Sequence, residues 1–147
     1  MEHSHDTAPY GALILRNALG IMFISHALLK ILVFTPAGTV GFFASIGVPG
    51  WFAYPTMGAE LIGGILLVVG YRTRLVSMAL IPVLVGSIVL VHGSSGWLFS
   101  NEGGGWEYPM FLIAASFAQA ALGDGAYSLS RLLNDNRARR VSAAAVA

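Results

Sequence analysis

Five ionisable side chains lie within or beside the most apolar stretches of this sequence: His26, Lys30, Glu60, His92 and Glu107. Imidazole, ammonium and carboxyl groups hydrogen-bond and exchange protons, so a convergent set of them suits the binding of a polar headgroup and proton movement. His26 and Lys30 are four residues apart, a spacing that places both on one face of a helix. The chemistry therefore depends on whether the surrounding segments bring the other three to the same place.

The composition indicates what surrounds these groups. Of the 147 residues, 56% are hydrophobic and only 10% are charged, and the mean hydropathy is +0.72. A soluble domain is usually about 25% charged. The deficit excludes a disordered tail, a nucleic-acid module and an ordinary cytosolic enzyme, and it indicates a membrane protein. The sequence has no cysteine, which excludes disulfides and thiolate metal sites.

Apolar segments of suitable length predict membrane-spanning helices. A helical span needs about 20 residues, and strands of a barrel would show an alternation that these segments lack. The predicted spans are about 12–32, 55–70, 75–92 and 107–122. We therefore predict an all-α fold, a four-transmembrane-helix bundle within residues 1–133, followed by a flexible cytoplasmic tail over 134–147.

The connections between the spans differ in character. Residues 33–54 are apolar but broken by glycine and proline, and they predict a short interfacial outer helix over Pro36–Ile46. Six of the eight basic residues lie in the 71–74 connection or the C-terminal segment. The positive-inside rule therefore predicts a cell (inner) membrane protein with both termini in the cytoplasm. Arg16 is interpreted as an anchor that reaches the inner interface.

Depth estimates bring the five ionisable groups together. At about 1.5 Å per residue, Lys30 lies roughly 5 Å, His26 roughly 10 Å and Glu60 roughly 7 Å below the outer ends of their helices. His92 ends the third span and Glu107 begins the fourth. Ionisable groups inside a membrane face the bundle interior and mark functional sites. We predict that Lys30 pairs with Glu60, that His26 lines the same cavity, and that Glu107 covers it.

Small residues support the inward placement of Glu60. Gly64 lies one helical turn below it, and Ala59 and Gly63 flank it. This spacing allows a neighbouring helix to approach closely.

Three kinds of site fit this set of residues. A quinone headgroup needs hydrogen-bond donors and a proton path, which His, Lys and Glu provide. A metal site could use His26, Glu60, His92 and Glu107, although their spacing matches no metal motif. A proton-coupled transport pocket is the third, but no inverted repeat supports it.

Each residue also has a purely structural interpretation. Lys30 could extend to the outer interface, and Lys30 with Glu60 could be a structural ion pair. His26 could bond a backbone carbonyl, and His92 and Glu107 could cap helix ends.

Several of these motifs resemble one family. LRNALGIMFISHALLKIL (15–32), FFASIGVP (42–49), GAELIGGILLVVGYRTRL (58–75) and GGGWEYPMFLIAASFAQAALGDGAYSL (103–129) are together similar to the DoxX family of membrane proteins. The matched positions are Arg16, His26, Lys30, Glu60, Glu107 and Pro109. Ala27 stands where glycine is usual. The resemblance implies a four-helix integral membrane fold and an association with respiratory and redox biochemistry.

From these arguments we expect a redox-associated membrane subunit that binds quinone or quinol near the outer leaflet through His26, Lys30, Glu60, His92 and Glu107. The chain is too short for a flavin or haem domain as well, so it is not expected to be a stand-alone enzyme. Expected partners are membrane lipid and an electron-transfer partner or larger membrane complex, with no nucleic acid. The alternative is a non-catalytic accessory or structural subunit of a respiratory-type membrane complex.

Overall fold

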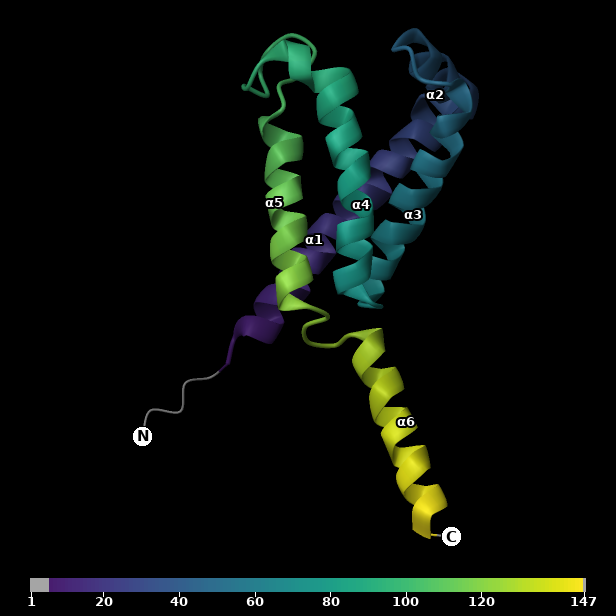
Figure 1. Cartoon of the computed structure of the whole chain (residues 1–147), viewed down its shortest axis with the longest axis vertical. Coiled ribbons are helices and arrows are strands. Elements are labelled where there is room, and N and C mark those ends of the chain that lie inside the picture. The colour runs from purple at the N-terminus through teal and green to yellow at the C-terminus, as the bar shows by residue number, and fades with distance from the viewer. Residues whose placement is uncertain (1–5, 147) are drawn as a thin grey trace.

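The computed structural model describes residues 6–146 and, within that range, contains helices and no strand (Figure 1). The six α-helices are α1 (Ala8–Leu28), α2 (Thr35–Ser45), α3 (Ala53–Val69), α4 (Thr73–Ser87), α5 (Glu107–Leu122) and α6 (Leu129–Val146). The all-α prediction is therefore confirmed. The outer helix expected over 36–46 is α2, shifted by one residue.

Short turns of other helix types extend three of these elements. The π-helical turns η1 (Leu29–Val33) and η3 (Ile88–His92) continue α1 and α4. The 3₁₀ turn η2 (Gly50–Phe52) precedes α3, and η4 (Gly93–Ser95) follows η3. With these extensions, the helical segments Ala8–Val33, Gly50–Val69 and Thr73–Ser95 contain 26, 20 and 23 residues and are long and apolar enough to cross a membrane.

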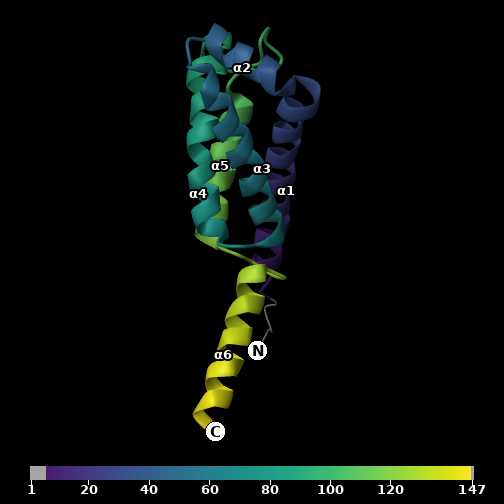
Figure 2. The ribbon, with the colours of Figure 1, turned by 90° about the vertical axis from the view of Figure 1, so that its right-hand side faces the viewer.

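The bundle consists of two helix pairs. The helix α1 packs most extensively on α3, and α4 packs most extensively on α5 (Figures 1 and 2). Only 16 residues long, α5 matches the bounds predicted for the fourth span. A buried core lies between the pairs and includes Leu19, Phe23, Leu67, Leu80, Leu84 and Leu112.

Glycines allow α1 and α3 to cross at backbone contact. A Cβ atom on Gly64 would lie 2.8 Å from the carbonyl oxygen of Gly20, and one on Gly20 would lie 2.7 Å from that of Gly64. A Cβ atom on Gly63 would meet the side chain of Leu80 on α4 at 2.9 Å. The predicted role of the small residues on this helix is thus confirmed at Gly63 and Gly64.

The interpretation of Arg16 as an anchor that reaches the inner interface is wrong, because its side chain is buried within the bundle. Its guanidinium is buried, and it donates to the carbonyl oxygens of Leu67 at 3.0 Å and of Val68 at the C-terminal end of α3. It also donates to those of Ala126 at 3.0 Å and Tyr127 at 3.2 Å, in the α5–α6 connection. Carbonyls at the end of a helix have few partners within the helix, and a cationic donor beside them is favourable.

The segment expected to be a flexible tail is a helix in the structure. The helix α6 continues to Val146 and extends away from the bundle (Figure 1). Its first turn is tied to the α3–α4 connection, because the Ser130 hydroxyl accepts from the Arg72 amide at 3.0 Å. No glycine or proline follows Gly125, and Leu, Ala and Arg favour helix. Residues 1–5 and 147 of the predicted domains lie outside the described range.

Candidate functional site

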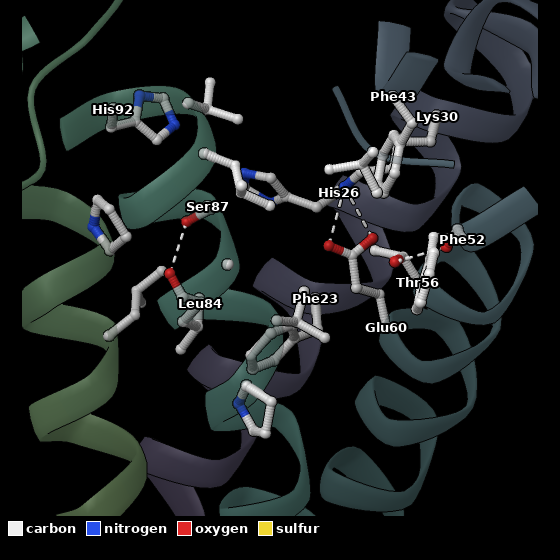
Figure 3. A pocket seen from close by; sticks show the side chains of 18 of the residues that line it. Phe23, His26, Lys30, Phe43, Phe52, Thr56, Glu60, Leu84, Ser87 and His92 are labelled. Atoms are coloured by element: carbon white, nitrogen blue, oxygen red, sulfur yellow. Dashed lines mark hydrogen bonds and ion pairs between the residues drawn. The ribbon is translucent and has the colours of Figure 1, made fainter. Parts of the chain in front are cut away.

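A cavity of about 630 Å³ lies at the end of the bundle away from α6. Its walls come from α1, α3, α4 and α5, with α2 and the 46–52 connection beside them. Most of the lining is apolar, including Phe23, Phe43, Phe52, Leu84 and Leu112. A small number of polar groups project into this apolar space (Figure 3).

The pair predicted between Lys30 and Glu60 is present in this cavity. The Nζ atom of Lys30 donates to both carboxylate oxygens of Glu60, each at 2.8 Å. The Lys30 side chain is 21% exposed and the Glu60 side chain 6%. The glycine crossing of α1 and α3 holds the two helices close enough for this contact. Both residues line the cavity, as predicted.

The turn η1 and helix α2 position Lys30 from the other side. The amide of Phe34 donates to the carbonyl oxygen of Leu29 at 3.0 Å, five residues back, which is the π-helical pattern. The carbonyl oxygen of Lys30 in turn accepts from the hydroxyl of Thr39 on α2, at 3.1 Å. Lys30 is therefore fixed at its backbone by α2 and at its ammonium by α3.

His26 lines the same cavity, one turn below Lys30, as predicted. Its Nδ1 atom lies 2.9 Å from the carbonyl oxygen of Met22. Because a carbonyl oxygen only accepts, Nδ1 carries the hydrogen. The ring stacks on Tyr108 of α5, with centroids 6.4 Å apart and planes at 24°. Both interpretations of His26 are therefore confirmed: it bonds a backbone carbonyl and it lines the cavity.

His92 reaches the cavity from the opposite wall (Figure 3). It lies in η3, where the amide of Gly93 donates to the carbonyl of Ile88. Its Nδ1 atom lies 3.0 Å from the carbonyl oxygen of Gly104 and 3.2 Å from that of Gly103. His92 therefore joins the end of η3 to the glycine-rich connection and also faces the cavity.

Glu107 does not cover the cavity, which corrects the prediction made for it. Its carboxylate accepts from the backbone amide of Phe99 at 2.6 Å and lines a separate shallow groove with Trp97. Successive residues of a helix point about 100° apart, so the cavity is reached by the next two residues, of which Tyr108 also borders the groove of Glu107. Tyr108 and Pro109 are the residues of α5 that line the cavity at this level.

The four residues considered as metal ligands are not brought together. Among residues 6–146, no three His, Asp or Glu side chains form a group that could hold a metal ion. The carboxylate of Glu60 is engaged by Lys30 at both oxygens, and Glu107 lies outside the cavity. His26 and His92 remain on opposing walls.

Three polar residues of the cavity were missed from the sequence: Thr56, Ser87 and Tyr108. Thr56 lies four residues before Glu60, so helical spacing could have found it. Tyr108 follows Glu107 directly, and only the rotation of α5 decides which of the two faces the cavity. Ser87 lies where α4 passes into η3, a change of helix type that the sequence pattern does not reveal.

Comparisons with known proteins agree on one family. The sequence pattern of the DoxX family matches residues 11–93. "Putative oxidoreductase CatD" of Bacillus subtilis (strain 168) is 35% identical over 108 residues, covering 74% of this chain and 77% of that protein. "Inner membrane protein YqjF" of Escherichia coli (strain K12) is 31% identical over 129 residues, covering 84% and 92%. No solved structure matches.

Proposed function

The chain belongs to the DoxX family of membrane proteins, and we propose that it is a redox-associated subunit that binds the headgroup of a quinone or quinol in this cavity. The observation that carries the proposal is an apolar cavity of about 630 Å³ with a few convergent polar groups. Sites for small organic ligands commonly measure about 300–1,000 Å³ and have this composition. The Bacillus subtilis relative bears the name "Putative oxidoreductase CatD", which accords with such a role.

The lining residues would hold such a headgroup in complementary ways. Lys30 keeps one N–H beyond the two that it gives to Glu60, and this hydrogen could reach a ligand oxygen. His26 and His92 offer polar contacts from opposing walls. Phe43 and Phe52 supply aromatic surface for a flat ring. An isoprenoid tail would extend between the helices into lipid.

The proposal includes an arrangement in the membrane. We place α5 as a fourth crossing, although its 16 residues span only about 24 Å of a hydrocarbon core near 30 Å thick. The basic residues of the α3–α4 connection and of α6 gather at one end. The positive-inside rule puts that end in the cytoplasm, and hence the cavity near the outer leaflet. Electrons would pass to or from an electron-transfer partner in a larger membrane complex.

The test is co-purification. Protein purified in mild detergent is extracted with organic solvent, quinones are quantified per protein chain, and metals are assayed in parallel. We expect quinone enriched well above its ratio in the bulk membrane lipid. Gly86→Phe should abolish the enrichment, because Gly86 lines the cavity and its Cβ position is open, so the new ring would occupy the ligand's volume. Gly58→Phe is the matched control, on an open helical position outside the cavity.

A specific observation favours the alternative of a non-catalytic accessory subunit. Lys30 and Glu60 satisfy each other without a ligand, so the pair alone can be explained as a structural contact between α1 and α3. Absence of both quinone and stoichiometric metal from the purified protein would contradict the quinone proposal and support this alternative.

A further inference from the structure

Both histidines of the cavity direct a hydrogen-bond acceptor towards it. In each ring Nδ1 carries the hydrogen, because it faces a backbone carbonyl: that of Met22 for His26 and that of Gly104 for His92. In a neutral imidazole the other nitrogen, Nε2, then holds a lone pair. Nε2 is separated from Nδ1 by the single ring carbon Cε1, and it belongs to a ring that lines the cavity in both residues, from opposing walls (Figure 3). The structure shows no partner for either Nε2 among residues 6–146.

The hydroxyl groups of the cavity are arranged in the same way. Thr56 donates its hydrogen to the carbonyl oxygen of Phe52 at 2.8 Å. Ser87 donates to that of Leu84 at 2.8 Å (Figure 3). Each hydroxyl therefore has only its oxygen lone pairs left for a ligand. Four polar side chains in one cavity thus direct a hydrogen to a backbone carbonyl.

Donors facing the cavity are fewer. Two of the three hydrogens of the Lys30 ammonium point to Glu60, so one remains. The hydroxyl of Tyr108, at the edge of the cavity, is able to donate or accept. The balance of the polar lining is therefore towards acceptors.

Resting on the proposed function, we infer that the cavity selects the reduced, dihydroxy form of its ligand, a quinol, over the quinone. A quinol carries two O–H donors on opposite sides of its ring, which match acceptors on opposing walls. A quinone carries only carbonyl oxygens, which would leave the histidine and hydroxyl lone pairs without partners in an apolar site, an unfavourable arrangement. The single remaining N–H of Lys30 suits either form, so it does not discriminate.

The size of the preference follows from the number of bonds. One net hydrogen bond changes affinity by roughly three- to tenfold, so two should favour the quinol by roughly ten- to a hundredfold. Tighter binding of the reduced form raises the midpoint potential of the bound two-electron couple, by about 30 mV for each tenfold. The inference thus predicts an affinity ratio and a potential shift of defined sign.

The experiment compares both forms on the wild-type protein. The probes are a short-chain benzoquinone and its hydroquinone, titrated anaerobically onto the full chain in lipid nanodiscs. Both titrations are carried out at the same, mildly alkaline pH. Tighter binding of the hydroquinone by tenfold or more supports the inference. Equal binding, or tighter binding of the quinone, overturns the inference but leaves the proposed function standing. Binding of neither form overturns both.

Variants attribute the preference to the named atoms. His26→Phe and His92→Phe keep an aromatic ring but lose Nε2, and each should weaken hydroquinone binding roughly three- to tenfold without weakening quinone binding. Ser87→Ala should act in the same direction. Ser25→Ala is its control, because that hydroxyl makes the same kind of bond, to Ile21, on a surface outside the cavity. Loss of affinity for both forms alike would contradict the assignment of Nε2 as acceptor.

Discussion

The pair formed by Lys30 and Glu60 gives the sharpest prediction about stability. We expect Lys30→Met and Glu60→Gln each to destabilise the protein, because each leaves the other group charged in an apolar cavity wall. The carboxylate has no second cation among its hydrogen-bond partners within residues 6–146. Removing the ammonium therefore leaves the buried Glu60 carboxyl group without its cationic partner.

The magnitude follows from burial and geometry. Breaking a buried ion pair by removing one partner costs about 3–5 kcal/mol. The Lys30 side chain is 21% exposed, so some screening by solvent reduces this cost, and we expect about 3 kcal/mol for each single variant. In a chain of this length that corresponds to roughly 6–12 °C in the unfolding midpoint.

The assay is thermal unfolding in detergent, followed by circular dichroism. Glu102→Gln is the control, because it removes an exposed carboxylate from the connection before α5. Single variants of Lys30 and Glu60 that melt with the wild type would refute the reasoning, since no buried charge would then be left unpaired.

The double variant distinguishes a structural role of the Lys30–Glu60 pair from a role in ligand binding. Replacing both partners by neutral groups of similar shape is often nearly neutral for stability, so Lys30→Met with Glu60→Gln should recover most of the lost midpoint. Recovery of both stability and quinone binding would assign the pair a structural role. Recovery of stability without binding would place the pair in the ligand site.

Two further predictions concern the other end and the middle of the α1–α3 pair. Gly64→Val should lower the free energy of unfolding by about 1–3 kcal/mol, because its Cβ would lie 2.8 Å from the Gly20 carbonyl oxygen. Gly58→Val is the control: no atom lies within 4 Å of its Cβ position, so it should melt close to the wild type. Arg16→Leu should cost about 3 kcal/mol, because the carbonyl oxygens of Val68, Ala126 and Tyr127 would lose the guanidinium as donor. Arg16→Lys should rescue little, since an ammonium lacks the planar fork. Limited proteolysis at the 123–128 connection should detect the loosening in both Arg16 variants, and resistance equal to the wild type would contradict this role.

The sequence was sufficient to predict those features that depend mainly on a single physical rule. Hydropathy and length located α1 to α5 but not α6, which is too polar to resemble a membrane span. Depth along the helix axis predicted the contact of Lys30 with Glu60, because that contact depends mainly on rise per residue. The prediction was wrong for Glu107, where a rotation of about 100° between neighbours decides between two adjacent residues. The depth of a residue along the helix axis does not determine how the helix is rotated about that axis. The apolar residues of α5 form only a weak stripe, so they do not indicate its rotation either.

Arg16 shows a second limit. Its position near the inner end suggested an interfacial anchor, and its type alone could not reveal that carbonyls of α3 and of the α5–α6 connection converge on it. Those partners are 51 and 110 residues away in the chain. Backbone acceptors leave no mark in the sequence, so a buried arginine that binds them looks like any other basic residue near a helix end.

The two helix pairs explain why the polar groups of the cavity face one another. Cations of α1 and η1 fasten α1 to α3, with Arg16 at one end and Lys30 at the other, on either side of the glycine crossing. The pair α4–α5 is joined at its far end through η3 and the connection that His92 bonds. His26 thus belongs to one pair and His92 to the other, and the cavity is the space between the pairs. At the cavity, no hydrogen bond among residues 6–146 joins one pair to the other. A ligand that donates to both Nε2 atoms would supply such a link. The number of hydrogens that the ligand can donate, and not its size alone, should therefore decide how tightly it binds.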